Sequence, residues 1–322
     1  TQEKGAPAGL LFEHYGTGGN WMLKHMLFFV NPNAGHAEIR TQLMDVVTIF
    51  TRGGYDVTVH PTSRSGEIPQ VIAAEGHRYD MIVSAGGDGT LNESVTGLMQ
   101  LSQPPVLGYL PGGTVNDVAS TLQLPKNCLE AAKIVVSGRS VSIDVGSIND
   151  RWFAYVAAFG AFTDVSYRTA QNDKRILGRM AYLLRGVQAI TEIRPIPVTV
   201  EVNGQTIQDE VILGLVGSTT SVGGFKARRE LEISLTDGLS EIILVRRIKN
   251  LVDLNAVAAA ILRQDFTGEY FHSFKASEAV ISFEDPVAWT LDGEFGGNIR
   301  RAEIHNHRQA LQIMVPNESF IP

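Results

Sequence analysis

The chain has almost no cysteine and no long hydrophobic run. Cys128 is the single cysteine among 322 residues, so no disulfide can form within the chain, which agrees with a reducing compartment. No apolar run reaches the ~18–20 residues that a membrane-spanning helix needs; the run at 26–30 has only the length of a buried strand. These absences predict a cytoplasmic protein that is at most peripheral to a membrane and has no transmembrane segment.

The chain is also short of positive charge and of the common nucleotide-binding signatures. Lys and Arg number 27 against 34 Asp and Glu, a formal net charge of -7, which argues against bulk nucleic-acid binding. Neither Gly-x-x-x-x-Gly-Lys-Ser/Thr nor a Gly-x-Gly-x-x-Gly that follows a strand occurs. The sequence therefore predicts no nucleic-acid partner, and a nucleotide site would belong to neither of those two folds.

Strand-like and helix-like segments alternate through the first part of the chain. Strand patterns fall at 26–30, 55–60, 79–85 and 106–110, and helical spacing falls at 38–51, 68–75, 90–99, 114–121 and 129–136. Such alternation indicates a mostly parallel sheet with helices on both faces. We therefore expect an α/β domain over residues 24–142. Residues 1–21 lack a signal-peptide pattern, and we expect a leader there that is disordered or was added to the native chain.

From about residue 141 the pattern changes to short β-rich runs with turn signals between them. The runs lie at 141–145, 152–158, 197–202, 205–216, 240–245, 279–283 and 302–305, with turn signals such as Asn203-Gly204. This spacing predicts antiparallel hairpins and a β-rich, sandwich-like second domain over 143–306, interrupted by helices at 173–192 and 251–263. Residues 307–322 are expected to return to the first domain.

Two glycine-rich loops follow predicted strands and open predicted helices. The first glycine loop, residues 86–90, reads Gly-Gly-Asp-Gly-Thr, and the second glycine loop, residues 111–117, reads Pro-Gly-Gly-Thr-Val-Asn-Asp. Glycines let backbone N–H groups close around phosphate oxygens, and a helix start adds partial positive charge. Asp88 then makes sense as a Mg²⁺ ligand or a proton acceptor. The alternatives are a tight turn capped by Asp88 and an Asp117 that only balances the helix dipole.

Together with Asn-Pro-Asn-Ala-Gly at 31–35, these loops resemble the catalytic domain of the diacylglycerol kinase family, which includes sphingosine and ceramide kinases and bacterial lipid kinases. The segments that match are 30–35, 86–93 and 110–117, and the later segments 221–226, 236–238 and 291–294 resemble the bacterial members. The resemblance runs from about residue 26 to the C-terminus. It implies an NAD kinase/phosphofructokinase-like nucleotide-binding domain over 24–142 and a lipid-substrate domain over 143–306.

The resemblance also implies a role for individual residues. Catalysis would use Glu294 as general base together with Asp88 and Asp117, and Asp88, Asp117, Asp144 and Glu232 would hold metal ions. The nucleotide would be bound by Asn31, Thr62, Gly86, Gly87, Asp88, Gly89, Thr90, Asn92, Gly113 and Thr114. Taken without the resemblance, Glu294 reads as an exposed carboxylate in a hairpin turn.

Three features stand apart from this pattern or leave an alternative open. Glu232 occupies a position where the family usually has Asp, which puts the structural metal in doubt, and His36 replaces a Lys or Arg that often follows the first-strand glycine. Residues 168–194 combine six basic residues with an apolar stripe. A basic amphipathic helix suits an anionic membrane surface, although an ordinary packing helix gives the same pattern.

The sequence as a whole predicts an ATP-dependent lipid kinase. It would transfer the γ-phosphate of ATP, with Mg²⁺, to the hydroxyl of a lipid at a membrane surface, with diacylglycerol giving phosphatidic acid as the expected reaction. The rival readings are a soluble kinase of the NAD kinase or phosphofructokinase type and a nucleotide-sensing protein without catalysis. The identity of the acceptor lipid and a homodimeric state are left open.

Overall fold

A computed structural model describes residues 23–34, 38–113, 116–161, 194–217, 221–222, 225–226 and 234–318. The predicted leader at 1–21, the helix at 173–192, and the residues His36, Thr114 and Glu232 lie outside this described part. Among the described residues, no helix is both long enough and apolar enough to cross a membrane.

The first part of the chain builds four strands that pair in parallel in the order β2-β1-β3-β4. They are β1 (Lys24–Val30), β2 (Tyr55–Pro61), β3 (Met81–Gly86) and β4 (Val106–Pro111). The helices between and after them are α1 (Glu38–Arg52), α2 (Glu67–Glu75), the 3-10 turn η1 (Gly76–Arg78), α3 (Asp88–Leu98), α4 (Asp117–Thr121) and α5 (Cys128–Ser137).

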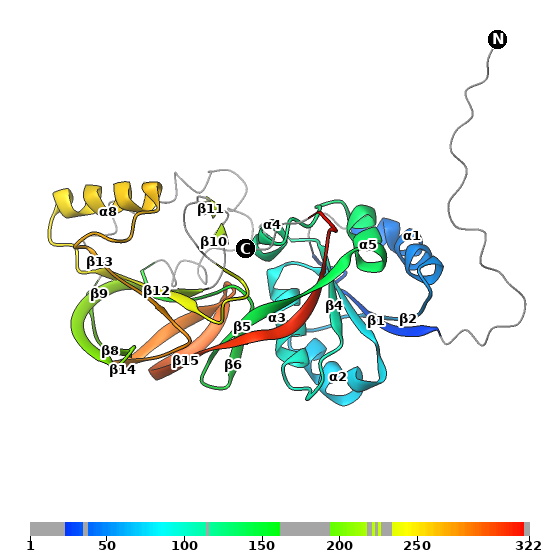
Figure 1. The fold of residues 1–322 in the computed structure, drawn as a ribbon, viewed down its shortest axis with the longest axis horizontal. Helices are drawn as coiled ribbons and strands as arrows, with labels where there is room; N and C mark the ends of the chain where they lie inside the picture. The colour runs from blue at the N-terminus through cyan, green and yellow to red at the C-terminus, as the bar shows by residue number, and fades with distance from the viewer. Residues whose placement is uncertain are drawn as a thin grey trace, which may run out of the picture.

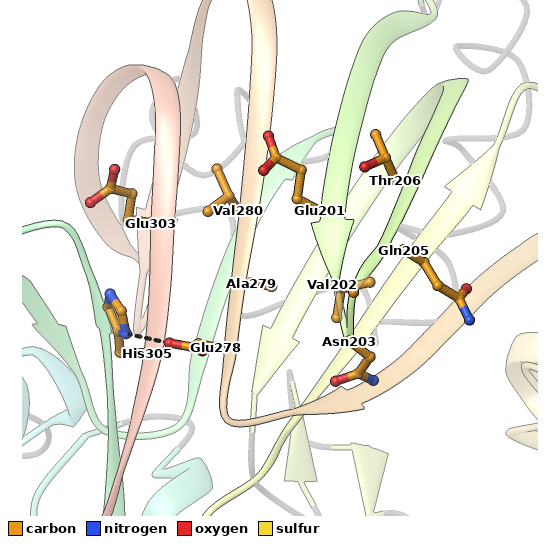
Figure 2. Close-up of a pocket in the computed structure, with 11 residues that line it drawn as sticks. Glu201, Val202, Asn203, Gln205, Thr206, Glu278, Ala279, Val280, Glu303 and His305 are labelled. Carbon is orange, nitrogen blue, oxygen red and sulfur yellow. Dashed lines mark ion pairs between the residues drawn. The ribbon is translucent and has the colours of Figure 1, made fainter.

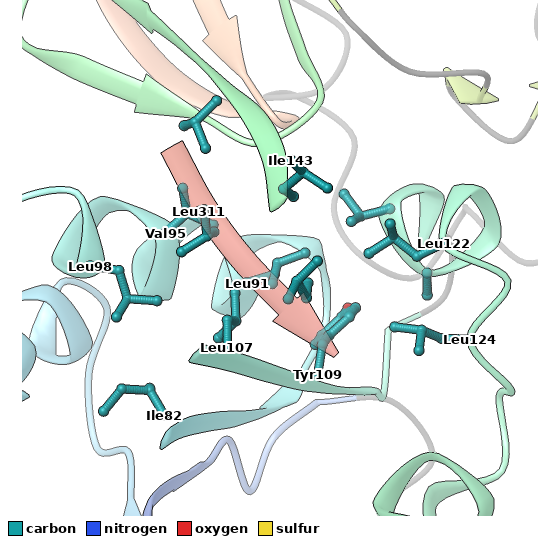
Figure 3. Close-up of a cluster of buried hydrophobic side chains, with 14 of the residues drawn as sticks. Ile82, Leu91, Val95, Leu98, Leu107, Tyr109, Leu122, Leu124, Ile143 and Leu311 are labelled. Carbon is teal, nitrogen blue, oxygen red and sulfur yellow. The ribbon is translucent and has the colours of Figure 1, made fainter. Parts of the chain in front are cut away.

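Alternating side chains of these strands fill two cores, one on each face of the sheet. Leu27 and Ile82 belong to the core that α2 and α3 cover, and Figure 3 shows this cluster with Leu91 and Val95 of α3. Phe28 belongs to the opposite core, which α1 and α5 cover. Because successive strand residues point to opposite faces, a strand that is apolar throughout needs cover on both faces.

The rest of the chain is rich in antiparallel strands, as the sequence predicted. These are β5 (Arg139–Ile148), β6 (Arg151–Phe153), β7 (Val156–Gly160), β8 (Ile196–Val202), β9 (Gln205–Gly217), the short pair β10 (Ser221–Val222) and β11 (Phe225–Lys226), β12 (Ser240–Arg246), β13 (Phe271–Ala276), β14 (Glu278–Leu291) and β15 (Glu294–Val315). Strands β7 and β8 each pair with both β9 and β14, so these four strands close a ring around a third core. Helix α8 (Leu251–Arg263) lies outside this ring (Figure 1).

Strand β15 joins the two parts of the chain into one sheet. It pairs with β14 and β5 in antiparallel fashion, and Ile313 near its end pairs with Leu107 of β4 in parallel fashion. The described strands therefore form a 13-stranded sheet apart from β10 and β11. Figure 1 shows β15 running from the β-rich part toward β4. The hairpin that precedes β15, at the other end of this strand, contacts α3 through a hydrogen bond from Asn92 to Asp292.

Candidate functional site

The two glycine loops lie against each other at the carboxyl ends of β3 and β4. The Gly112 N–H donates a hydrogen bond to the Gly86 carbonyl over 2.7 Å. A Cβ atom added to Gly113 would lie 2.7 Å from the Gly87 Cα, and one added to Gly87 would lie 3.3 Å from the Gly113 Cα. The approach at Gly113 is too close for a Cβ atom, so position 113 needs glycine for the loops to meet, whereas a Cβ at 87 would fit only tightly.

Asn116 fixes the second glycine loop and ties it to Asp88. Its side chain makes two hydrogen bonds to Gly113, accepting from the N–H at 2.9 Å and donating to the carbonyl at 2.7 Å. Its own N–H donates to Asp88 Oδ2 at 2.9 Å. Asn116 adopts a left-handed φ of 54° and precedes α4, which begins at Asp117 rather than at Thr114. The sequence pattern predicts no role for Asn116, although Asn is among the non-glycine residue types that most often adopt this conformation.

The carboxylate of Asp88 is half-buried and only partly satisfied. Its Oδ1 atom is buried without a hydrogen-bond partner. Burial raises the pKa of Asp88 to about 6, with a further rise from nearby Asp117 and Asp292, against the lowering effect of the Asn116 N–H. A buried carboxylate oxygen without a donor, next to a second carboxylate, is a setting that a divalent cation stabilises. Asp88 and Asp117 therefore fit a bound metal ion.

The hairpin between β14 and β15 brings Glu294 to the first glycine loop. Asp292 and Gly293 form its two-residue turn with φ angles of 50° and 85°, as in a type I′ turn. A Cβ atom added to Gly89 would lie 3.1 Å from Glu294 Oε1. The exposed carboxylate of Glu294 thus lies beside the helix start that carries Asp88. Glu294 is one of the catalytic residues predicted from the sequence, and its role as a base stays a prediction.

Asp292 and Asn92 are the contact between this hairpin and α3. Asn92 Nδ2 donates to Asp292 Oδ2 at 2.7 Å and to the Trp152 carbonyl at 3.2 Å. With both amide hydrogens engaged, Asn92 has no donor left for a phosphate in this arrangement. The contacts of Asn92 therefore favour a role in holding the hairpin of Asp292 over the predicted role in binding the nucleotide. Asp292, in turn, received no role from the sequence.

The other described residues predicted to bind the nucleotide lie in the α/β part of the chain, at the ends of β1, β2 and β3. Asn31 follows β1, and its side-chain amide donates to the hydroxyl of Thr90 at 3.1 Å. Thr90 is buried next to Gly86. A Cβ atom added to Gly86 would collide with the side chain of Thr90. The Thr62 N–H donates to the Val30 carbonyl at 2.9 Å, which joins the ends of β2 and β1. Thr90 thus packs against the first glycine loop and Asn31 contacts Thr90, whereas Thr62 lies at the end of β2, two strands away from β3.

Two carboxylates without a predicted role, Glu67 and Glu93, hold the loop after Thr62. Glu67 accepts from the N–H of Ser63 at 2.7 Å, and this bond is the main reason that the pKa of Glu67 falls to about 2. Glu93 accepts from the N–H of Gly66 at 2.8 Å. Because Glu93 lies on α3, it fastens this loop to the helix that follows the first glycine loop.

Asp144 lies in a different setting from Asp88 and Asp117. Its two oxygens accept hydrogen bonds from the N–H groups of Gly238 at 2.7 Å and Gln309 at 2.8 Å. Burial raises the pKa of Asp144. Across the described part of the chain, no group of three or more His, Cys, Asp and Glu side chains is placed to hold a metal ion. Asp144 is therefore bonded to the backbone at Gly238 and Gln309, and its predicted metal role, like those of Asp88 and Asp117, stays a prediction.

A surface pocket of about 420 Å³ lies elsewhere, around the turn between β8 and β9 (Figure 2). Its lining includes Glu201, Glu278 and Glu303, and His305 makes an ion pair of 4.0 Å with Glu278. None of its lining residues belongs to the glycine loops or to the hairpin of Glu294. Three carboxylates would repel a polyphosphate, so this pocket does not extend the site.

Comparison with known proteins agrees with this geometry. Residues 25–148 match the diacylglycerol kinase catalytic domain. Diacylglycerol kinase of Bacillus subtilis (strain 168) is 32% identical over 299 residues, covering 92% of this chain and 98% of the relative. That of Staphylococcus carnosus (strain TM300) is 31% identical, covering 92% and 97%. A crystal structure of a diacylglycerol kinase from Bacillus anthracis str. Sterne superposes with a TM-score of 0.75 at 25% identity, covering 91% of this chain and 97% of that chain.

Glycine loops at the ends of parallel strands, a half-buried carboxylate and a second carboxylate brought in by a distant hairpin define a phosphoryl-transfer enzyme, and the relatives agree. The chain belongs to the diacylglycerol kinase family and is a kinase. A kinase takes its phosphoryl group from ATP, so ATP is the expected donor substrate.

Proposed function

We propose that this protein is a lipid kinase that transfers the γ-phosphoryl group of ATP to the hydroxyl of diacylglycerol, giving phosphatidic acid and ADP. The observation that carries the proposal is the approach of Glu294 to Gly89, because a carboxylate from a distant hairpin lies beside a glycine loop that can cradle phosphates. The names of the relatives support diacylglycerol as the acceptor.

The α/β part of the chain, residues 24–142, binds the triphosphate of ATP. Backbone N–H groups of the first glycine loop and the start of α3 face the phosphate oxygens. The N–H groups of Gly112 and Gly113 in the second loop instead donate to Gly86 and Asn116. Asp88 and Asp117 hold Mg²⁺, which neutralises charge on the transferring group when it is bound. Asn116 keeps the loops in register, since it contacts both Gly113 and Asp88.

Glu294 acts on the acceptor. Its carboxylate takes the proton of the lipid hydroxyl as the hydroxyl oxygen forms a bond to the γ-phosphorus. The bond from that phosphorus to the β–γ bridging oxygen breaks, and the leaving group is ADP. A general base needs to reach the hydroxyl within about 2.6–3.2 Å in the reactive complex, and the exposure of Glu294 leaves its carboxylate accessible to an acceptor.

The test is phosphorylation of a lipid panel with radiolabelled ATP. The panel contains diacylglycerol, ceramide, sphingosine, a polyprenol and phosphatidylglycerol, each dispersed in detergent, and the same assay is run with NAD and with a sugar phosphate in buffer. We expect diacylglycerol to be labelled fastest. If only another lipid is labelled, that lipid replaces diacylglycerol as the proposed acceptor. If only NAD or a sugar phosphate is labelled, the proposal of a lipid kinase is wrong. ATP binding without transfer to any acceptor would identify a nucleotide sensor.

Glu294→Gln tests the base within the same assay. The variant keeps the shape of the side chain and removes the proton acceptor, so kcat should fall at least 100-fold while ATP affinity stays almost unchanged. A Gln variant with the wild-type kcat would remove Glu294 from the chemistry.

A further inference from the structure

Asn92 lies where it can connect the nucleotide side of the site to the acceptor side. It is on α3, four residues after Asp88, so both residues lie on the same face of the helix. Its amide donates to the carboxylate of Asp292 and to the Trp152 carbonyl. Both acceptors belong to the β-rich part of the chain, and Asp292 is two residues before Glu294.

Asp292 is the anchor of the hairpin that carries Glu294. Its side chain is only 4% exposed. Three consecutive N–H groups, those of Ala154, Tyr155 and Val156, donate to its carboxylate over 2.6 to 3.1 Å. With the Asn92 amide, the two oxygens accept four hydrogen bonds, which is the full capacity of a carboxylate.

The hairpin turn consequently lies along the first turns of α3. Asp292 contacts Asn92, and Glu294 lies beside Gly89, which is one helical turn earlier. A carboxylate with four donors and a buried position cannot shift without breaking several hydrogen bonds. The bonds to residues 154–156 fix the hairpin within the β-rich part, and the two bonds from Asn92 join that part to α3 beside the first glycine loop.

We infer that Asn92 and Asp292 are a positioning pair that holds Glu294 in reach of the acceptor hydroxyl, so that Asn92 serves the acceptor side of the reaction rather than the nucleotide phosphates. The inference rests on the proposed role of Glu294. A displacement of about 1 Å at a reacting group can lower a rate by about 100-fold, so a contact that touches neither substrate can control kcat.

The first test separates the acceptor role from a nucleotide contact. In Asn92→Ala, kcat with diacylglycerol should fall about 10- to 100-fold, and the Kd for ATP, measured directly by calorimetry, should stay within about twofold of wild type. A matched control is Asn127→Ala, which removes the side-chain cap of α5 and should leave kcat unchanged. An ATP Kd raised tenfold with kcat retained would make Asn92 a nucleotide ligand and overturn the inference.

The second test asks whether Asn92 acts through Glu294. In a Glu294→Gln background, Asn92→Ala should cause almost no further loss of kcat, because the group it positions is already disabled. A full multiplicative loss would show that Asn92 acts independently, and it would overturn the inference. If Glu294→Gln lowers kcat but Asn92→Ala does not, the positioning role of Asn92 is wrong and the role of Glu294 as base stands. If Glu294→Gln keeps the wild-type kcat, Glu294 is not the base.

Discussion

At the level of single residues, a carboxylate such as Asp88 is suited to binding a cation and costs stability when none is bound. Its Oδ1 has no hydrogen-bond donor, and its pKa of about 6 means that the folded protein holds the proton more tightly than the unfolded chain. The stabilisation linked to that proton is complete below the unfolded pKa of about 4 and is lost as pH rises through about 6.

Asp88→Asn should therefore change stability and activity in opposite directions. Asn resembles the protonated acid, so at pH 8 without divalent cations the free energy of unfolding should rise by about 1–3 kcal/mol, and at pH 4 it should hardly change. Phosphoryl transfer should fall by a factor on the order of 100 or more. Urea unfolding at the two pH values checks the first effect, and a variant no more stable at pH 8 would contradict it.

Asn116 provides a residue-scale prediction about backbone strain. Its left-handed φ of 54° costs about 1–2 kcal/mol for Ala but almost nothing for Gly. The free energy of unfolding of Asn116→Ala should therefore be roughly 1 kcal/mol lower than that of Asn116→Gly, as measured by urea unfolding. Both should lose kcat/KM, because neither can hold Gly113.

A matched control for Asn116 is Asn203, which also has a positive φ, in the turn between β8 and β9. Asn203→Ala should lower stability for the same reason and leave kcat/KM at the wild-type value. If it lowered kcat/KM as much as Asn116→Ala does, the loss would reflect general destabilisation rather than the loop contact.

At the level of elements, the close approach of the Glu294 hairpin to α3 makes Gly89 a sensitive position. An added Cβ would lie 3.1 Å from Glu294 Oε1, so the carboxylate has to give way by a few tenths of an ångström. Gly89→Ala should retain or slightly raise stability, since Ala favours a helix by up to about 1 kcal/mol over Gly. At saturating ATP its kcat should fall. Gly268→Ala, in open space, is the control; equal kcat values in the two variants would contradict the contact.

The elements show how far the sequence could be interpreted. Apolar runs and helical spacing located β1 to β4 and α1 to α3 to within a few residues, because each buries a regular face. They missed β13, and they joined β6 and β7 into one strand across the segment 154–155. Most of β15 was also missed, because its partners change along its length from β14 to β5 and β4, so no single alternation pattern covers it.

The candidate site shows the same division between local and tertiary signals. Gly87, Gly113 and Asp88 could be predicted because a glycine-rich stretch after a strand and a helix start are local features of the chain, whereas the contact between the two loops is tertiary. Asn92 was predicted as a phosphate ligand, and only the fold shows that its donors are used by Asp292 and Trp152. A residue such as Asp292 carries no local signal, since its donors come from residues 154–156.

At the level of the whole molecule, several buried carboxylates bind their protons more tightly in the folded state. Burial raises the pKa of Asp144 and Asp292. Burial also raises the pKa of Glu241 to about 7, although its partner Lys275 opposes this. Each of these groups makes the folded state bind more protons than the unfolded chain over part of the range from pH 4 to 8, so each lowers stability as pH rises. The lowered pKa of Glu67 has the opposite sign, but its effect is confined to more acidic pH.

The pH dependence of stability tests this account in the intact protein. Asp88→Asn combined with Glu241→Gln removes the two carboxyl groups whose pKa values are about 6 and about 7. Between pH 5 and pH 8, without divalent cations, the stability of wild type should fall relative to the double variant by about 2–4 kcal/mol. Urea unfolding of both proteins at pH 5, 6.5 and 8 measures the difference. Added Mg²⁺ should restore stability to the wild type at pH 8 and not to the double variant, because only ionised Asp88 completes the cation site. A difference that stays constant across this pH range would show that neither group titrates there in the folded protein.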